Sequence, residues 1–329
     1  MSNSRNYYFD GIRGLAILMV IGIHTYPNPD SDTFWGVTEI CLRQLLNCAV
    51  PIFFAISGYF LVKKDFNSFE DIKMFWKKQI LKVYVPTLVW SLPYFLIEIL
   101  KGESIFGNIL FLFVCGFGPF YFIATIIQYY VLLPIIKKIK SFSNIIPFTI
   151  SLISSLVAAY YISWGGFSSL PIIFYAGPFY VWIVFFVLGT ILGGAKNLII
   201  QINYIGCFSL ILMGLMIQFF ELFIMHDNGV FSVGLKMSSV LFSISAIIVI
   251  FSKSNNLALD CNNRLVKLGS ISFPIYLIHS YFALLVGRLS HGLIPWFLSW
   301  MLVCALSIGA VYYCKHYIPK RLHYYLGVL

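Results

Sequence analysis

FDGIRGLAILMVIGIHT, residues 9–25, is the stretch that decides the fold of this chain, because it is an oily run long enough to begin a membrane crossing. Two polar side chains interrupt it: Arg13 lies near its start and His24 near its end. Charged and titratable groups are costly in hydrocarbon, and they usually mark a site or a pathway. We therefore interpret this stretch as a first membrane helix that also carries functional residues.

The composition of the whole chain agrees with a membrane protein. Of the 329 residues, 60% are hydrophobic and only 10% are charged, and the mean hydropathy is +0.88. A soluble globule of this size needs a polar surface that this composition cannot supply. The apolar segments also follow one another too closely for a separate soluble module. We expect one integral-membrane domain over 1–329.

Apolar segments of bilayer-spanning length recur along the chain, and a bilayer core needs about 20 such residues per helix. We predict an all-α polytopic protein with about ten transmembrane helices. The stretch 105–118 is apolar but short and is broken by glycine, so we interpret it as an interfacial or re-entrant piece. The ten predicted spans are 11–27, 36–62, 83–100, 119–136, 144–162, 174–194, 203–225, 231–251, 270–288 and 294–314.

The basic residues predict the orientation, because loops rich in Lys and Arg stay on the cytoplasmic side. Most of the 22 Lys and Arg side chains fall in alternate loops that share one side with the N-terminus, whereas only Lys101 and Arg288 fall in loops on the other side. Both termini are therefore predicted to be cytoplasmic. The net charge of +10 then faces anionic lipid headgroups, and no nucleic-acid partner is needed to explain it. The seven cysteines include no C-x-x-C pair, so we expect no metal site.

Arg13 and His24 lie on one face of the first predicted helix. Eleven residues separate them, which places His24 about 20° beyond three full turns and about 16 Å further along the axis. Asp10 lies one turn before Arg13, close enough to pair with it. Arg13 can be a snorkelling anchor at the headgroups and His24 a hydrogen-bonded interfacial residue. The functional interpretation makes His24 a general base, since imidazole titrates near neutral pH.

Three further polar side chains fall inside predicted spans. Arg43 lies well inside the second span, where it can hold a substrate oxygen or pair with Glu39 one turn away. Ser57 on the same span can donate a hydrogen bond. His279 lies midway along the ninth span and needs a polar partner, so it is either a second site residue or a structural hydrogen-bond donor to a neighbouring helix.

Several segments together resemble, in order, the acyltransferase-3 family of integral-membrane acyltransferases. The run 9–25 is similar to the family's Asp-Gly-x-Arg-Gly opening and to its Arg-x10-His motif, here Arg13 and His24. Further similarity lies in VPIFFAISGYFLV (50–62), in FWKKQILKVYVP (75–86), which matches the family's basic inner loop, in FGPFYFIATIIQYYVLLPII (117–136) and in SISFPIYLIHSYF (270–282). This chain departs from the family pattern at a few positions. Lys77, Lys78 and Lys82 stand where arginines are common, and Tyr121 with Phe122 replaces a Trp-Phe pair.

The resemblance implies transfer of an acyl group, usually acetyl, from cytoplasmic acyl-CoA to a hydroxyl of a cell-envelope polysaccharide or lipid-linked glycan. His24 is the expected general base, and Arg13 with Asp10 and the lysines 77, 78 and 82 is expected to bind the donor, with acetyl-CoA as co-substrate and no permanently bound cofactor. Arg43, Ser57, Tyr121 and His279 are the remaining binding residues that we expect, with Arg43 and His279 orienting the acceptor or stabilising the oxyanion.

The family also implies location in a bacterial plasma membrane, here in the membrane-only O-acetyltransferase form. Two other classes of protein explain the buried polar residues without an acyl donor. One is a transporter or flippase for a lipid-linked glycan or small solute, in which they line a pathway. The other is a structural subunit of an envelope complex.

Overall fold

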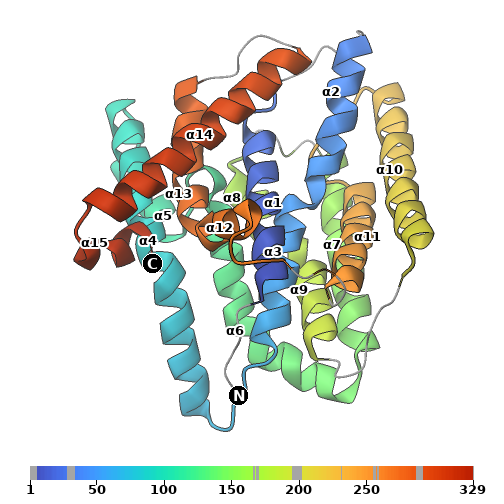
Figure 1. The fold of residues 1–329 in the computed structure, drawn as a ribbon, viewed down its shortest axis with the longest axis horizontal. Coiled ribbons are helices and arrows are strands. Elements are labelled where there is room, and N and C mark those ends of the chain that lie inside the picture. The colour runs from blue at the N-terminus through green and yellow to red at the C-terminus, as the bar shows by residue number, and fades with distance from the viewer. Residues whose placement is uncertain are drawn as a thin grey trace.

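The first helix, α1 (Tyr7–His24), runs through the middle of the molecule in the computed structural model (Figure 1). Asn6 caps its start, because the Asn6 side chain accepts hydrogen bonds from the backbone N–H groups of Tyr8 and Phe9. The helix ends at His24, and the N–H of Thr25 closes the last turn on the Ile21 carbonyl. Its 18 residues give a length of about 27 Å.

The structure describes residues 6–27, 34–165, 167, 170–194, 202–230, 232–254, 257, 259–286 and 292–328, and these contain helices and no strand. The fold class is therefore all-α, as predicted. After α1 the elements are α2 (Phe34–Leu45), η1 (Leu46–Cys48), α3 (Ala49–Leu61), α4 (Phe69–Leu100), α5 (Ile105–Phe113), η2 (Gly118–Phe120), α6 (Tyr121–Phe142), α7 (Ile145–Trp164), α8 (Ile172–Ala176), α9 (Phe179–Gly194), α10 (Tyr204–Asp227), α11 (Met237–Lys253), α12 (Arg264–Ser270), α13 (Ser272–Val286), α14 (Leu293–Tyr317) and α15 (Lys320–Leu326).

Six helical segments in the described part of the chain are long and apolar enough to cross a bilayer, or seven if the bent pair α12–α13 counts as one. The shorter apolar helices α9 and α11 do not reach the same length. These segments support a membrane protein, while the count of ten spans and the cytoplasmic position of both termini stay predictions. The six are Gly36–Leu61, Phe69–Leu100, Gly118–Phe142, Ile145–Trp164, Tyr204–Asp227 and Leu293–Tyr317.

Three predicted segments differ in detail from the observed ones. The second predicted span is interrupted by the short η1 turn. Pro51 follows in the first turn of α3, where the N–H that proline lacks would form no helical hydrogen bond. The basic stretch 75–86, expected as an inner loop, lies within the 32-residue helix α4. The ninth predicted span (270–288) begins at a break where α12 and α13 meet at 82°, so the turn and the helix before it were not predicted.

The stretch 105–118 contains the nine-residue helix α5, whose length of about 14 Å is too short to cross a bilayer. A non-helical segment follows it and contains Cys115 at φ 56° and Gly118 at φ 51°.

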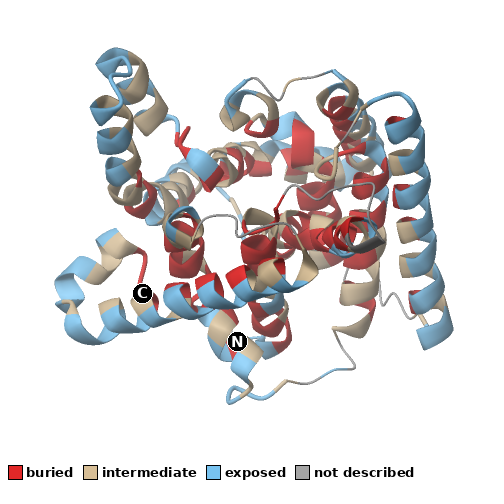
Figure 2. Ribbon diagram, turned by 90° about the horizontal axis from the view of Figure 1, so that it is seen from above, coloured by how far each residue is buried: buried red, intermediate tan, exposed pale blue. Residues whose placement is uncertain are grey.

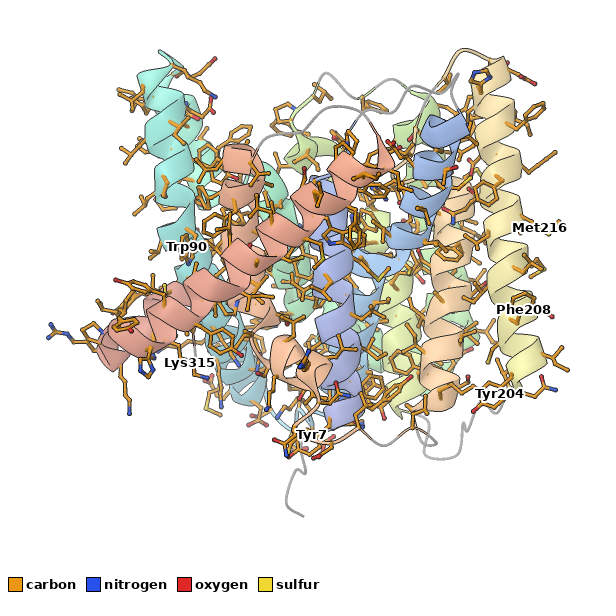
Figure 3. All side chains as sticks on the ribbon, turned by 45° about the horizontal axis from the view of Figure 1, so that its top comes forward. Tyr7, Trp90, Tyr204, Phe208, Met216 and Lys315 are labelled. Carbon is orange, nitrogen blue, oxygen red and sulfur yellow. The ribbon has the colours of Figure 1, made fainter. Side chains whose placement is uncertain are left out.

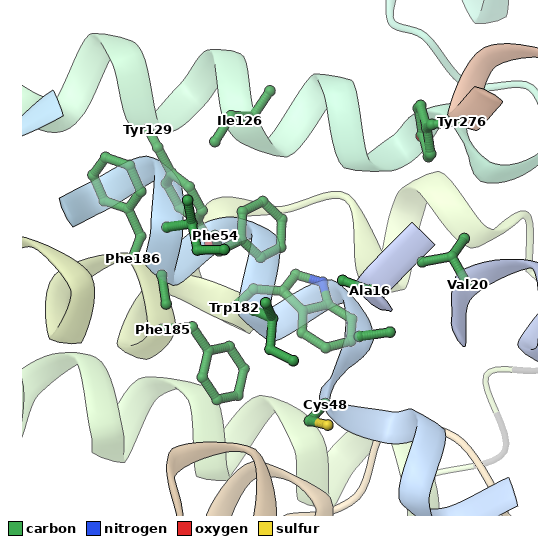
Figure 4. Packing of buried hydrophobic residues seen from close by; sticks show 14 of the residues in the cluster. Ala16, Val20, Cys48, Phe54, Ile126, Tyr129, Trp182, Phe185, Phe186 and Tyr276 are labelled. Carbon is green, nitrogen blue, oxygen red and sulfur yellow. The ribbon is translucent and has the colours of Figure 1, made fainter. Parts of the chain in front are cut away.

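The buried core lies where α1, α3, α6, α9 and α13 meet, and helices at the edge such as α10 are mostly exposed (Figure 2). Phe208 and Met216 of α10 project outward at 68% and 63% exposure (Figure 3), as lipid-facing side chains do. Figure 4 shows the aromatic packing inside, where Phe54 of α3 contacts Tyr129 of α6 and Trp182 of α9. Most of α1 is buried in this core, while Leu15 is exposed.

Candidate active site

His24 and His279 lie together, although 255 residues of sequence separate them. Their ring centroids are 5.0 Å apart, with the rings inclined by 58°. The contact forms because α1 ends at His24 beside the middle of α13. The sequence predicted both residues as candidates, and the structure brings them to one place.

The hydrogen bond of His279 determines which of its ring nitrogens is available. His279 is fully buried, and its Nδ1 lies 2.7 Å from the carbonyl oxygen of Tyr276. A carbonyl only accepts, so Nδ1 carries the proton and the neutral ring keeps its lone pair on Nε2. Nε2 has no hydrogen-bond partner among the described residues. His279 thus presents a buried acceptor nitrogen beside the His24 ring.

A cavity of about 310 Å³ lies next to His24, and we call it the His24 cavity. Three predicted site residues line it: His24 from α1, Arg43 from α2 and Tyr121 from α6. This volume lies at the lower end of the range typical of small-molecule sites. The other lining residues are Val20, Ile23, Asn47, Val50, Ile162, Phe167, Ile172, Tyr175, Ala176, Trp182, Phe185, Ser232, Gly234, Leu235, Ser239 and Ser243.

A second cavity of about 350 Å³ contains Arg13, and we call it the Arg13 cavity. Arg13 pairs with Asp10 as the spacing predicted, with Arg13 Nη1 3.1 Å from Asp10 Oδ1. Lys82 and Ser57 also line this cavity, and Ser57 Oγ donates to the Phe53 carbonyl at 2.8 Å. The other lining residues are Val20, Val50, Phe53, Gln79, Val83, Phe122, Ile123, Ile126, Tyr130, Gly269, Ser270, Ser272, Phe273 and Tyr276.

The two cavities share part of their walls. Val20 of α1 and Val50 of α3 line both. Only one layer of side chains therefore separates the two cavities at this point. Arg13 and His24, which the helical spacing placed on one face of α1, lie in different cavities on either side of this layer.

Not every predicted residue lies at a cavity. Lys77 and Lys78 are exposed on the same helix as Lys82 and do not line the Arg13 cavity. The alternative pairing of Arg43 with Glu39 is also not what the structure contains. Arg43 Nη1 instead donates to Asn47 Oδ1 at 2.6 Å, and the ion pairs of the described residues do not include Arg43.

A polar network lies beside the His24 cavity and was not predicted from the sequence. Asn47 Nδ2 donates to Gln44 Oε1 at 3.1 Å and to Gln218 Oε1 at 3.0 Å. Lys236, fully buried, also donates from Nζ to Gln44 Oε1. A signal was present in the sequence: Gln44 and Asn47 follow Arg43 within one turn of an apolar helix. The partners Gln218 and Lys236 lie far away in sequence and could not be paired by spacing.

Comparison with known proteins agrees with this architecture. Residues 6–316 match the model of the acyltransferase domain of the acyltransferase-3 family, so the chain belongs to that family. The chain is also similar to an amino-acid racemase of Enterococcus faecalis, with 33% identity over 109 residues. That similarity covers 31% of this chain and only 15% of the racemase. No solved structure matches the chain.

Proposed function

We propose that this protein transfers an acyl group, most simply acetyl, from cytoplasmic acyl-CoA to a hydroxyl of a cell-envelope polysaccharide or lipid-linked glycan. Membership of an acyltransferase family supports the reaction type. The observation that carries the proposal is the pair of cavities that meet at Val20 and Val50, with His24 on one side and Arg13 on the other. A two-substrate transfer reaction needs this kind of arrangement.

In this proposal the donor occupies the Arg13 cavity. Arg13 and Lys82 supply positive charge there, suited to the phosphates of acyl-CoA. Lys77 and Lys78 lie on the same helix and attract the polyanion from solution. The thioester then extends toward the layer formed by Val20 and Val50.

The acceptor occupies the His24 cavity, where its hydroxyl lies beside the imidazole of His24. A sugar hydroxyl is a weak nucleophile at neutral pH, so His24 takes its proton as the oxygen attacks the thioester carbon. The C–O bond of the ester forms, the C–S bond breaks, and His24 returns the proton to the CoA sulfur. Tyr121 lines the same cavity and assists in orienting the acceptor hydroxyl, and His279, which lines neither cavity, assists from behind the His24 ring that it contacts.

The test measures transfer of label from acetyl-CoA in membranes that contain the wild type, His24→Ala or Arg13→Ala. We expect His24→Ala to lower the rate about 10²- to 10⁴-fold, the usual contribution of a general base. Arg13→Ala should mainly raise the KM for acetyl-CoA. His316→Ala is the matched control, because it removes an exposed imidazole at the end of α14.

Full transfer by His24→Ala at normal expression would exclude His24 as the base. A separate measurement distinguishes the enzyme from a transporter or flippase. Purified protein should be stabilised against heat by CoA, because a donor site binds CoA and a solute pathway has no reason to do so. Absence of this stabilisation favours the transporter.

A further inference from the structure

Arg43 is a buried guanidinium in the wall of the His24 cavity. Its side chain is only 6% exposed, and it lines the cavity together with His24 and Tyr121. Its Nη1 donates to Asn47, while Nε has no hydrogen-bond partner among the described residues. No carboxylate forms an ion pair with it in the described part of the chain. A buried charge without a counter-ion is costly, so a ligand that supplies one is strongly favoured.

The guanidinium is held in a fixed orientation. Asn47 uses its Nδ2 to donate to Gln44, Gln218 and the Val233 carbonyl, at 3.0 to 3.1 Å. This leaves Asn47 Oδ1 directed at Arg43 Nη1, 2.6 Å away. With Nη1 engaged, the buried Nε is left without a hydrogen-bond partner among the described residues. The Nε edge of a guanidinium matches a carboxylate or phosphate in bidentate geometry.

A second buried cation strengthens the positive potential. Lys236 is fully buried and reaches Gln44, the residue next to Arg43, and it too is absent from the ion pairs of the described residues. Glu221 lies nearby, where its Oε2 accepts the backbone N–H of Ser238 at 2.7 Å. Glu39 is also buried and lies one turn before Arg43 on α2, but it does not form an ion pair with Arg43. In a surrounding of low polarity two basic side chains outside the ion pairs of the described residues favour an anion in the cavity.

We infer that the His24 cavity binds an acidic sugar, one that carries a carboxylate or a phosphate, and that Arg43 holds the acidic group while a hydroxyl lies beside His24. If Arg43 served only to stabilise the oxyanion that forms during transfer, it would have no counter-ion in the substrate complex. An acidic acceptor supplies a counter-ion both in the substrate complex and during transfer. The role of this sugar as acceptor rests on the proposed function. Its binding requires only the cavity and Arg43.

Binding is measured first, without any acyl-CoA, by thermal shift of the detergent-purified protein. Three probes are compared: glucuronate, glucose 1-phosphate and uncharged glucose. We expect at least one acidic probe to raise the Tm of the wild type more than glucose does, and the larger of the two shifts identifies carboxylate or phosphate. Arg43→Gln should weaken acidic-probe binding about tenfold or more, the effect of losing a charge-assisted bidentate contact.

Lys101→Gln is the matched control, because it removes an exposed cation that does not line the cavity, and this variant should bind the probes as the wild type does. Arg43→Lys is the second variant if Arg43→Gln does not fold. Lysine keeps the positive charge but lacks the two parallel N–H donors of the guanidinium, so this variant should retain a weakened preference for the acidic probe. Equal shifts with all three probes, or no shift with any, would overturn the inference.

Kinetics separate this inference from the proposed function. If acidic sugars bind and no acyl group is transferred, the proposed function fails and the binding site stands. If transfer occurs, Arg43→Gln should raise the KM for the acidic sugar by a larger factor than it changes KM or kcat for glucose. An equal loss of kcat for glucose and glucuronate would assign Arg43 to the oxyanion and overturn the inference. A preference for succinyl-CoA over acetyl-CoA that disappears in Arg43→Gln would place the anion on the donor and overturn it too.

Discussion

His279 shows how one hydrogen bond determines the chemistry of a buried side chain. Its Nδ1 proton is directed to the Tyr276 carbonyl one turn earlier in α13, so only the lone pair of Nε2 is available beside His24. Such a ring accepts a proton or a hydrogen bond and, while neutral, has no donor to offer an oxyanion. In the proposed reaction this favours a role on the acceptor hydroxyl over oxyanion stabilisation.

Replacing His279 by Asn tests this role, because the Asn amide can still donate to the Tyr276 carbonyl but has no counterpart of Nε2. We expect His279→Asn to fold with nearly the wild-type Tm and to lose about tenfold to 10³-fold in transfer rate. His279→Ala should lower the transfer rate to a similar extent and should also lower the Tm, because the Tyr276 carbonyl loses its hydrogen-bond donor. Radiolabel transfer and thermal denaturation measure the two effects. Full activity of His279→Asn would make the residue purely structural.

The site residues that spacing could predict are those that share a helix. Asp10 and Arg13 pair as expected because they lie one turn apart, and Arg13 and His24 share a face because eleven residues make about three turns. The contact of His24 with His279 and of Asn47 with Gln218 depends on tertiary packing, which helical spacing does not encode. Arg13 and His24 lie in different cavities because Val20 and Val50 stand between these cavities. The sequence does not indicate this separation, because apolar residues are expected throughout a membrane helix.

At the scale of elements, α3 and α9 pack through glycine. A Cβ on Gly189 would overlap the Ala55 carbonyl oxygen, and one on Gly58 would overlap the carbonyl oxygen of Phe186. Small residues allow helices in membranes to approach until their backbones touch. This close approach helps fix α3, which carries Val50 and Ser57 to the cavities.

Gly189→Ala should therefore destabilise the protein by about 1 to 3 kcal/mol, the usual cost of overpacking a tight interface. Gly309→Ala is the control, because a Cβ at Gly309 of α14 meets no atom within 4 Å. It should be neutral or stabilising by up to about 1 kcal/mol, since Ala favours a helix over Gly. Thermal denaturation in detergent compares the two variants. Equal Tm values for both would show that the α3–α9 contact tolerates a methyl group.

The existence of most helices was predictable, while their breaks were less so. Long apolar runs identify α6, α7, α10 and α14 within a few residues. Residues 75–86 were predicted as a loop because they contain three lysines, but they are helical. A helix can continue into the headgroup region when its charged side chains reach water. The role of Gly58, which allows the close approach of α9, carries no signal in the apolar run 49–62.

At the scale of the whole molecule, the basic side chains predicted to face the cytoplasm also hold helix ends together. Lys140 Nζ donates to the Thr190 carbonyl and Lys253 Nζ to the Ile202 carbonyl, each at 2.7 Å. Lys137 Nζ lies 3.9 Å from Asp65 Oδ1. These contacts join segments that are distant in sequence and that the charge pattern assigns to the same, predicted cytoplasmic side.

The orientation can be tested with a cysteine that the chain already carries. Cys261 is exposed in the segment before α12, on the side predicted to be cytoplasmic. Asp260 raises the pKa of its thiol through a hydrogen bond and its charge, so the reactive thiolate increases as the pH rises and labelling should be faster at alkaline pH. A membrane-impermeant maleimide should leave Cys261 unlabelled in intact cells and label it after permeabilisation.

The opposite face has a matching position at Asn228, an exposed residue just after α10. In a Cys261→Ser background, Asn228→Cys should be labelled in intact cells, because the predicted topology places this loop outside. The Cys261→Ser variant alone is the control for the remaining cysteines, which are buried or half-buried. Labelling of Cys261 in intact cells, or protection of Asn228→Cys there, would invert the membrane orientation. The Arg13 cavity would then lie nearer the outer face, where no acyl-CoA is expected, so this measurement also bears on the proposed direction of acyl transfer.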